Sequence, residues 1–279
     1  MNISDFKIVA DSSADLYNLE KVKFQSAPLK IITFEKEFVD DEYADLEYMV
    51  NTLSKTNEKS STACPAPGDW LKAFGDSKYV FCISITSQLS GSYNAACIAR
   101  DMYMKKYADS RVFVIDSLSA GPELRLIAEK LEQLILQGLD FDEICNKITS
   151  YTKKTGLLFM LESMRNLANN GRVNPLVAKA AGLLGIRVVG RASDKGVLEL
   201  LEKSRGQKKA FESIVNNLKK LGATGNKIYI SHCFNEEGAN VLKQIILQEF
   251  KNAQIKIYRC GALCSFYAEK GGMLIGFEK

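Results

Sequence analysis

Ser90 and Gly91 carry the clearest potential for chemistry in this sequence. They follow an apolar run over 79–85 and a hydroxyl-rich segment, and they lead directly into a stretch with helical spacing. A serine hydroxyl and free backbone N–H groups at the start of a helix favour a negatively charged group. The loop therefore predicts a binding site for a carboxylate or a phosphate, and simple helix capping is the alternative.

Two further loops carry side chains that could serve the same anion. The segment Asp11-Ser12-Ser13 follows a buried-type strand, and open α/β sheets bind ligands at the carboxyl ends of their strands. Thr62 precedes a stretch that two prolines stiffen, and its hydroxyl could donate to an anion at Ser90. Taken alone, each loop is more simply explained as a turn or a rigid connector.

Serine catalysis is an alternative function for the same loop. A nucleophilic Ser90 would need a general base, and its Leu-Ser-Gly surroundings differ from the G-x-S-x-G nucleophile elbow. His232 is the only histidine and follows a separate strand. A Ser90–His232 catalytic pair is therefore an alternative that no neighbouring sequence pattern supports. The sequence has no Walker loop, dinucleotide-binding glycine motif or H-E-x-x-H motif. We therefore expect no cofactor and no metal.

The composition narrows the class of protein. The 37 Lys and Arg residues against 33 Asp and Glu give a net charge of +4, and no basic run is interleaved with aromatics, so nucleic acid is not an expected partner. The seven cysteines lack zinc or disulfide spacing, which favours reduced thiols. No signal peptide is visible, and no apolar run approaches ~18 residues. We expect a soluble cytoplasmic protein without stable membrane insertion.

The hydrophobic pattern of the first half predicts a parallel sheet with helices on both faces. Apolar, β-rich runs fall over 7–10, 24–34, 79–85 and 112–115. Helical spacing recurs over 69–74, 92–107, 122–137 and 140–153. Strands that alternate with helices in this way are typical of two-sided α/β sheets.

The second half predicts another α/β lobe with a different strand arrangement. Further strand-like runs fall over 157–160, 186–191, 197–201, 227–232 and, as the last clear strand, 255–258. A helical stretch is expected to end near residue 170, and an Ala- and Leu-rich stretch spans 174–184. The segment 194–196 is typical of a β-hairpin turn, and residues 236–250 are expected to form a helix. We predict an N-terminal lobe over 1–155, a C-terminal lobe with a mixed sheet over 156–279, and a ligand between them.

Taken in order, these loops resemble those of the DegV family. The matching pieces are DSSAD at 11–15, Thr62 ahead of PAPG at 65–68, SQLSGSY at 87–93, VIDSLSA at 114–120, NGRV at 170–173, the segment 178–185, LEKSRG at 201–206, ISHCFNEE at 230–237 and GAL at 261–263. Each piece is weak alone, whereas the ordered series is specific and covers nearly the whole chain.

The resemblance implies a bacterial two-lobed α/β protein that encloses a long-chain fatty acid in an apolar tunnel. In such proteins the carboxylate is held by the threonine that matches Thr62 and by the serine that matches Ser90. With the backbone of Gly91, these residues are our predicted ligand contacts. Some members present the fatty acid to a separate ATP-dependent fatty acid kinase, which forms an acyl phosphate, so a kinase of this kind is the predicted partner.

Other residues are predicted to support this site or to lie at its mouth. The supporting candidates are Asp11, Ser12, Ser13, Ser87 and Tyr267, and the candidates for the mouth or for a partner contact are Arg172 and Arg205. Tyr267 stands about where the family usually carries a histidine before Gly-Pro-Gly, and this chain lacks both. A tyrosine hydroxyl can donate a hydrogen bond but does not normally supply positive charge.

The leading hypothesis is therefore a fatty-acid carrier that catalyses no reaction itself. The first alternative is an enzyme that acts on a small phosphorylated or carboxylated substrate through Ser90 or His232. The second is a structural or regulatory module whose loops only cap helices.

Overall fold

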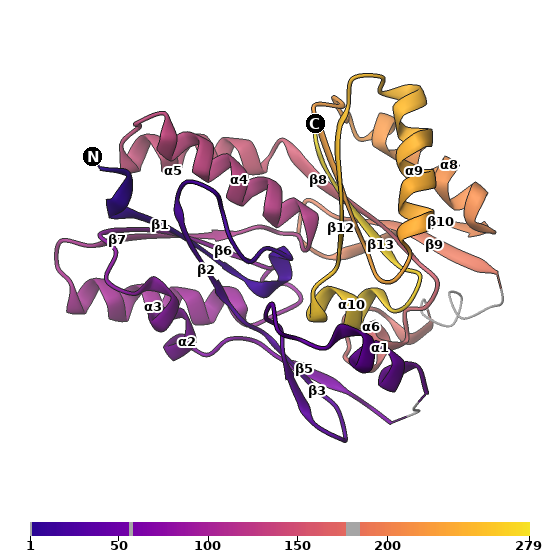
Figure 1. The fold of residues 1–279 in the computed structure, drawn as a ribbon, viewed down its shortest axis with the longest axis horizontal. Helices are drawn as coiled ribbons and strands as arrows, with labels where there is room; N and C mark the ends of the chain where they lie inside the picture. The colour runs from indigo at the N-terminus through magenta and orange to yellow at the C-terminus, as the bar shows by residue number, and fades with distance from the viewer. Residues whose placement is uncertain (1, 56–57, 177–184) are drawn as a thin grey trace.

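A fully parallel sheet forms the N-terminal part of the molecule. The computed structural model describes residues 2–55, 58–176 and 185–279 (Figure 1). Sheet A contains, in spatial order, β2 (Lys23–Ala27), β1 (Phe6–Asp11), β6 (Tyr79–Ser84) and β7 (Arg111–Asp116). Its two faces are covered by α2 (Pro67–Phe74) with α3 (Ser92–Lys106), and by α4 (Pro122–Leu136) with α5 (Phe141–Thr152) (Figure 1). The predicted two-sided parallel sheet is confirmed.

Alternation along β1 explains why this sheet is covered on both sides. Ile8 packs in the core that includes Leu124 of α4, whereas its neighbour Val9 packs in the core that includes Trp70 of α2. Successive side chains of a strand point to opposite faces, so a strand buried on both faces has a nearly continuous apolar sequence. The parallel strands also bring their carboxyl ends to one edge, where the loops after Asp11, Ser84 and Asp116 meet.

A mixed sheet forms the C-terminal part. Sheet C contains, in spatial order, β10 (Leu198–Arg205), β9 (Ile186–Ala192), β8 (Thr155–Leu161), β13 (Met273–Glu278), β11 (Lys227–His232) and β12 (Gln254–Arg259). Only β11 and β12 run parallel, and the other neighbours are antiparallel. Helices α8 (Gln207–Lys220) and α9 (Glu236–Glu249) pack on one face (Figure 1). The predicted mixed sheet and the hairpin between β9 and β10 are confirmed.

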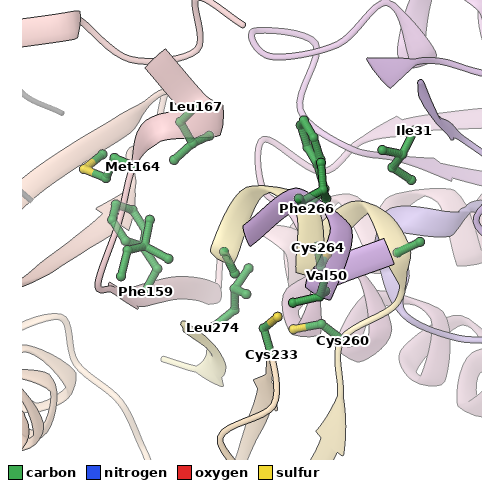
Figure 2. Close-up of a cluster of buried hydrophobic side chains, with 14 of the residues drawn as sticks. Ile31, Val50, Phe159, Met164, Leu167, Cys233, Cys260, Cys264, Phe266 and Leu274 are labelled. Carbon is green, nitrogen blue, oxygen red and sulfur yellow. The ribbon is translucent and has the colours of Figure 1, made fainter. Parts of the chain in front are cut away.

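The other face of sheet C points toward the N-terminal half of the chain. Leu158 and Met160 of β8 pack beneath α8 and α9, whereas Leu157, Phe159 and Leu161 belong to a second core. That core includes α10 (Ala262–Ala268) and the short helix α6 (Arg165–Asn169) (Figure 2). The strict alternation along β8 therefore assigns one set of side chains to each face.

A small third sheet connects the two halves. Sheet B has the order β4 (Glu37–Val39), β3 (Lys30–Ile32) and β5 (Ser61–Ala63), and α1 (Leu46–Lys55) lies between β4 and β5 in the chain. Ile31 and Val50 share a core with Phe266 and Leu274 from the other end of the chain (Figure 2). Strand β8 begins beside the predicted lobe boundary near 155, and the division into lobes 1–155 and 156–279 stays a prediction.

Several elements have no counterpart among the predicted segments, namely α1, β4, β5, α8, α10 and β13, although α8 buries Ala210, Ile214 and Leu218 at helical spacing. Strand β13 lies at the centre of sheet C, although 255–258 reads as the last strand of the sequence. A Cβ at Gly276 of β13 would lie only 2.7 Å from the backbone N of Glu123 in α4. Glycine is needed there because the helix backbone packs directly on the strand. The predicted Ala- and Leu-rich stretch over 174–184 and the matching segment 178–185 lie almost wholly outside the described residues.

Candidate functional site

An apolar cavity of about 340 Å³ lies between sheet C, α10 and the loops at the carboxyl edge of sheet A. Its size falls within the range of roughly 300–1,000 Å³ that is typical of small-molecule sites. One wall consists of Leu157, Phe159 and Leu161 of β8 with Leu274 of β13. Figure 2 shows Phe159 and Leu274 of this group. The remaining apolar lining comes from Leu29, Ala63, Ile85, Leu89, Ala120, Leu167, Leu198, Leu263 and Ala268.

Polar groups from four separate segments gather in the lining of this cavity. They are Thr62 of β5, Ser90 with Gly91 before α3, Arg172 after α6, and Tyr267 of α10. The Thr62 Oγ1 and Tyr267 OH atoms are 2.8 Å apart and share a hydrogen bond across 205 residues of sequence. The structure thus brings the three predicted ligand contacts together with Tyr267 and Arg172.

The loop at Ser90 presents both a hydroxyl and backbone donors. Ser90 Oγ accepts a hydrogen bond from the backbone N–H of Ser92 at 3.2 Å. Within the described residues, the backbone N–H groups of Ser90 and Gly91 donate to no protein acceptor. Such unsatisfied donors at the start of α3 suit an anionic oxygen.

Asp11 holds the Ser90 loop from behind without lining the cavity. Its buried carboxylate accepts hydrogen bonds from the Ile85 N–H at 2.9 Å and from the Ser92 hydroxyl at 2.6 Å. Burial raises the pKa of Asp11, and the hydrogen bonds from Ser13 and Ser92 oppose that shift. Because Asp11 holds both ends of the turn, it positions the segment that carries Ser90.

The other predicted supporting residues also act within the loops. Ser12 Oγ accepts from the Leu29 N–H at 2.9 Å, and the Ser13 hydroxyl donates to Asp11. The Ser87 backbone N–H donates to Asp116 at 3.1 Å, and its hydroxyl accepts from Gln88 Nε2 at 3.4 Å, so both groups make contacts within the loop. Of the supporting candidates, only Tyr267 lines the cavity itself.

The two predicted arginines lie in different places. Arg172 lines the cavity, and its Nε donates to the Leu89 carbonyl at 3.0 Å. It therefore supplies a positive charge next to the Ser90 loop. Arg205 is exposed at the end of β10 and does not line the cavity.

The structure does not pair Ser90 with His232. His232 is buried at the end of β11, is not among the cavity-lining residues, and its Nδ1 accepts from the Asn235 N–H at 3.2 Å. Burial lowers the pKa of His232, the nearby charge of Glu236 opposes that shift, and Arg259 adds to it. Among the described residues, His232 is thus not placed to serve Ser90 as the base that the enzymatic alternative requires.

Two buried carboxyl groups hold the start of α10. Asp15 Oδ1 accepts from the Gly261 N–H at 2.8 Å, and the two oxygens of Asp40 accept from the N–H groups of Ala262 at 2.6 Å and Leu263 at 3.1 Å. Burial, with the nearby Asp40 charge, raises the pKa of Asp15 to about 8, and burial raises the pKa of Asp40 to about 6. Both buried carboxyl groups thus bind a proton more readily than an exposed aspartate does.

Asp15→Asn is expected to flatten the dependence of stability on pH. Asp15 binds its proton up to about pH 8 in the native state but only to about 3.8 in the unfolded chain, so the free energy of unfolding falls as pH rises between these values. Asparagine does not titrate, so the variant should gain ~1 kcal/mol or more relative to the wild type between about pH 5.5 and about pH 7.5. Urea denaturation at both pH values measures this, and an equal difference at both would contradict it.

The burial of Asp40 and the identity of the apolar cavity-lining residues were not predicted from the sequence. Asp40 begins the acidic run Asp40-Asp41-Glu42, which is typical of a solvated surface, yet its side chain is fully buried. Glu269, which lies close to Tyr267 in sequence, accepts from the Asn166 N–H at 3.1 Å and is not among the cavity-lining residues. Neither orientation has a signal in the local pattern, because both depend on which segment packs opposite.

Two other features are absent from residues 2–55, 58–176 and 185–279, namely a membrane-spanning helix and a metal-binding cluster. None of their helices combines the length and hydropathy that crossing a membrane requires. In the same ranges, no three His, Cys, Asp or Glu side chains are grouped so that they could hold a metal ion.

Comparison with known proteins gives a consistent result. The family model described as "Uncharacterised protein, DegV family" matches residues 5–279. A DegV domain-containing protein of Streptococcus pneumoniae is 44% identical over 277 residues, which cover 98% of this chain and 99% of that protein.

Two solved structures are similar over nearly their whole length. A DegV family protein from Eubacterium eligens loaded with heptadecanoic acid has a TM-score of 0.96 and 42% identity, covering 98% of this chain and 99% of that chain. The Streptococcus pneumoniae fatty acid kinase (Fak) B3 protein loaded with linoleic acid has a TM-score of 0.95 and 44% identity, with coverage of 98% and 99%. Sequence, fold and ordered motifs agree, and the chain belongs to the DegV family.

Proposed function

We propose that this protein binds one long-chain fatty acid in the cavity, with the carboxylate between Thr62, Ser90 and Gly91. The observation that carries this proposal is the distribution of polarity: hydroxyls, backbone donors and Arg172 are combined with walls built from Leu, Ile, Phe and Ala. The bound acyl chains of the two similar structures support the same ligand class.

The energetics of the site suit such a ligand. Each buried methylene contributes ~0.8 kcal/mol, so an acyl chain gains affinity along its whole length. A hydrogen bond to a charged group contributes ~1.5–3 kcal/mol, which orients the carboxylate toward the donors of Thr62 and Ser90. Neither contribution requires a nucleophile or a general base.

We further propose that the protein is a carrier that presents the carboxylate to an ATP-dependent fatty acid kinase. In the part of the chain that the structure describes, His232 bonds to Asn235 and is not paired with Ser90, which argues against direct catalysis by this pair. The similar Fak B3 protein is named after a fatty acid kinase, which supports a kinase as the partner. Arg172 beside the carboxylate and the exposed Arg205 are the residues we propose at the mouth or the partner contact.

We propose the cytoplasm as the location of this carrier. All seven cysteines are free thiols, and four of them are buried. Free thiols persist in a reducing compartment, which fits a partner that uses ATP.

Solvent extraction of the purified protein followed by mass spectrometry tests the ligand. We expect one fatty acid per chain, and delipidated protein should take up added heptadecanoic or linoleic acid. Absence of a co-purified acyl chain together with no uptake would overturn the proposed ligand. Incubating the loaded protein with ATP alone should yield no acyl phosphate, and formation of acyl phosphate without an added kinase would overturn the carrier role.

Tyr267→His is expected to make fatty-acid affinity depend on pH. The histidine would become protonated near pH 6.5 and place a positive charge beside the carboxylate, which the tyrosine does not do. The affinity of the variant relative to the wild type should rise about tenfold, or ~1.4 kcal/mol, between about pH 7.5 and about pH 5.5. Titration of both proteins at both pH values measures the ratio, and a constant ratio would contradict it.

A further inference from the structure

Helix α10 is attached to sheet B at two points. At the start of the helix, Asp40, which directly follows β4, accepts from the Ala262 and Leu263 N–H groups. Near its end, the Tyr267 hydroxyl bonds to Thr62 of β5. Strand β3 lies between these strands and pairs with both, since Ile31 is opposite Phe38 of β4 and opposite Thr62 of β5.

Asp15 provides a further contact at the start of the helix. It has a left-handed backbone with φ 50° and accepts from the Gly261 N–H. A Cβ at Gly261 would lie 3.0 Å from Asp15 Oδ1 and 3.0 Å from Asp40 Oδ1. Glycine at 261 therefore lets the chain enter α10 between the two carboxyl groups.

We propose that Asp15 and Asp40 are positioning residues for the fatty-acid carboxylate, because they set the axial position of α10 and thereby place the Tyr267 hydroxyl opposite Thr62. An α-helix rises by about 1.5 Å per residue, so even a one-residue slip would break the 2.8 Å contact between Thr62 and Tyr267. Neither aspartate lines the cavity, so both act through the helix. This inference rests on the proposed carboxylate site.

The sensitive measurement is the affinity for heptadecanoic acid divided by the affinity for its methyl ester. A displaced Tyr267 weakens only recognition of the carboxylate, whereas general loosening of the cavity weakens both ligands. We expect both Asp40→Asn and Tyr267→Phe to lower this ratio about tenfold. In Asp40→Asn, an amide NH2 group replaces one of the two carboxylate oxygens, so it cannot accept from the N–H group bonded there, and the amide carries no charge. Glu42→Gln is the matched control, since it removes one charge from an exposed side chain two residues away.

A double-mutant cycle distinguishes positioning from a merely structural role. If Asp40 acts through Tyr267, Asp40→Asn should have no further effect on the ratio in the Tyr267→Phe background. Multiplicative effects, or an equal loss for acid and ester, would overturn the inference. A wild-type protein that binds acid and ester equally would instead refute the proposed carboxylate site.

Asp15 keeps the inference testable if Asp40→Asn does not fold. Asp15→Ala removes the acceptor of the Gly261 N–H and should lower the acid-to-ester ratio. Asp15→Asn retains an oxygen at that position and should restore the ratio to near the wild-type value. Equal ratios for Asp15→Ala and the wild type would contradict the proposed role.

Discussion

Thr62→Val is expected to weaken fatty-acid binding about 10- to 100-fold, because a hydrogen bond to a charged group contributes ~1.5–3 kcal/mol. Valine retains the branched shape of threonine, and the backbone pairing of residue 62 with Ile31 is independent of the side chain. The substitution therefore removes only the hydroxyl group. In the protein this hydroxyl bonds to Tyr267, and we propose that it also donates to the ligand carboxylate. Isothermal titration with heptadecanoic acid measures the effect.

Controls separate the carboxylate contact from a change in the cavity. Thr62→Ser keeps a hydroxyl and should retain most of the affinity. The methyl ester of the same fatty acid should bind Thr62→Val nearly as well as the wild type, and adding Ser90→Ala should weaken acid binding further. An unchanged affinity of the double variant for the acid would remove Thr62 and Ser90 from the proposed contacts.

Ala120→Phe is expected to reduce fatty-acid affinity at least about 100-fold, or ~2.7 kcal/mol. Ala120 lines the cavity between β7 and α4 and packs against its apolar walls. A phenyl ring at this position would occupy volume needed by the acyl chain, and excluding only four methylenes costs roughly 3 kcal/mol. Titration of the delipidated variant with fatty acid measures the loss.

Thermal unfolding provides an independent measurement of the same prediction. A ligand that binds only the native state raises its stability by mass action, so added fatty acid should raise the Tm of the wild type but not of Ala120→Phe. Ala108→Phe is the matched control, because residue 108 is exposed and not part of the cavity lining. A normal ligand-induced shift in Ala120→Phe would place the acyl chain elsewhere.

Strands and helices with strong periodicity were predictable from the sequence. The run over 79–85 corresponds to β6, and the helical spacing over 92–107 corresponds to α3 within one residue at its end. Short elements such as α10 and β5 were not, because seven or three residues carry too little periodicity. Strand β13 was missed for another reason: its pairing with β8 and β11 is wholly non-local.

The candidate site was predictable where a local turn carries the donors. Ser90 and Gly91 lie between a strand and a helix, and this arrangement alone indicates an anion site. The loop of Thr62 gave only a weak indication, which its resemblance to the family strengthened, and Tyr267 was indicated by the resemblance alone. The role of these residues in binding stays a prediction, whereas their common position around one cavity is a property of the structure.

The sequence by itself determined the two kinds of sheet, the loops that carry hydroxyls and the membership of the DegV family, because these depend on local patterns in a known order. Only the tertiary structure decided that Leu157, Phe159 and Leu161 form a cavity wall, while Leu158 and Met160 lie under helices. It also decided that Asp40 is buried at the start of α10. The physical reason is that alternation assigns side chains to a face, but what lies opposite that face depends on contacts between residues far apart in the chain.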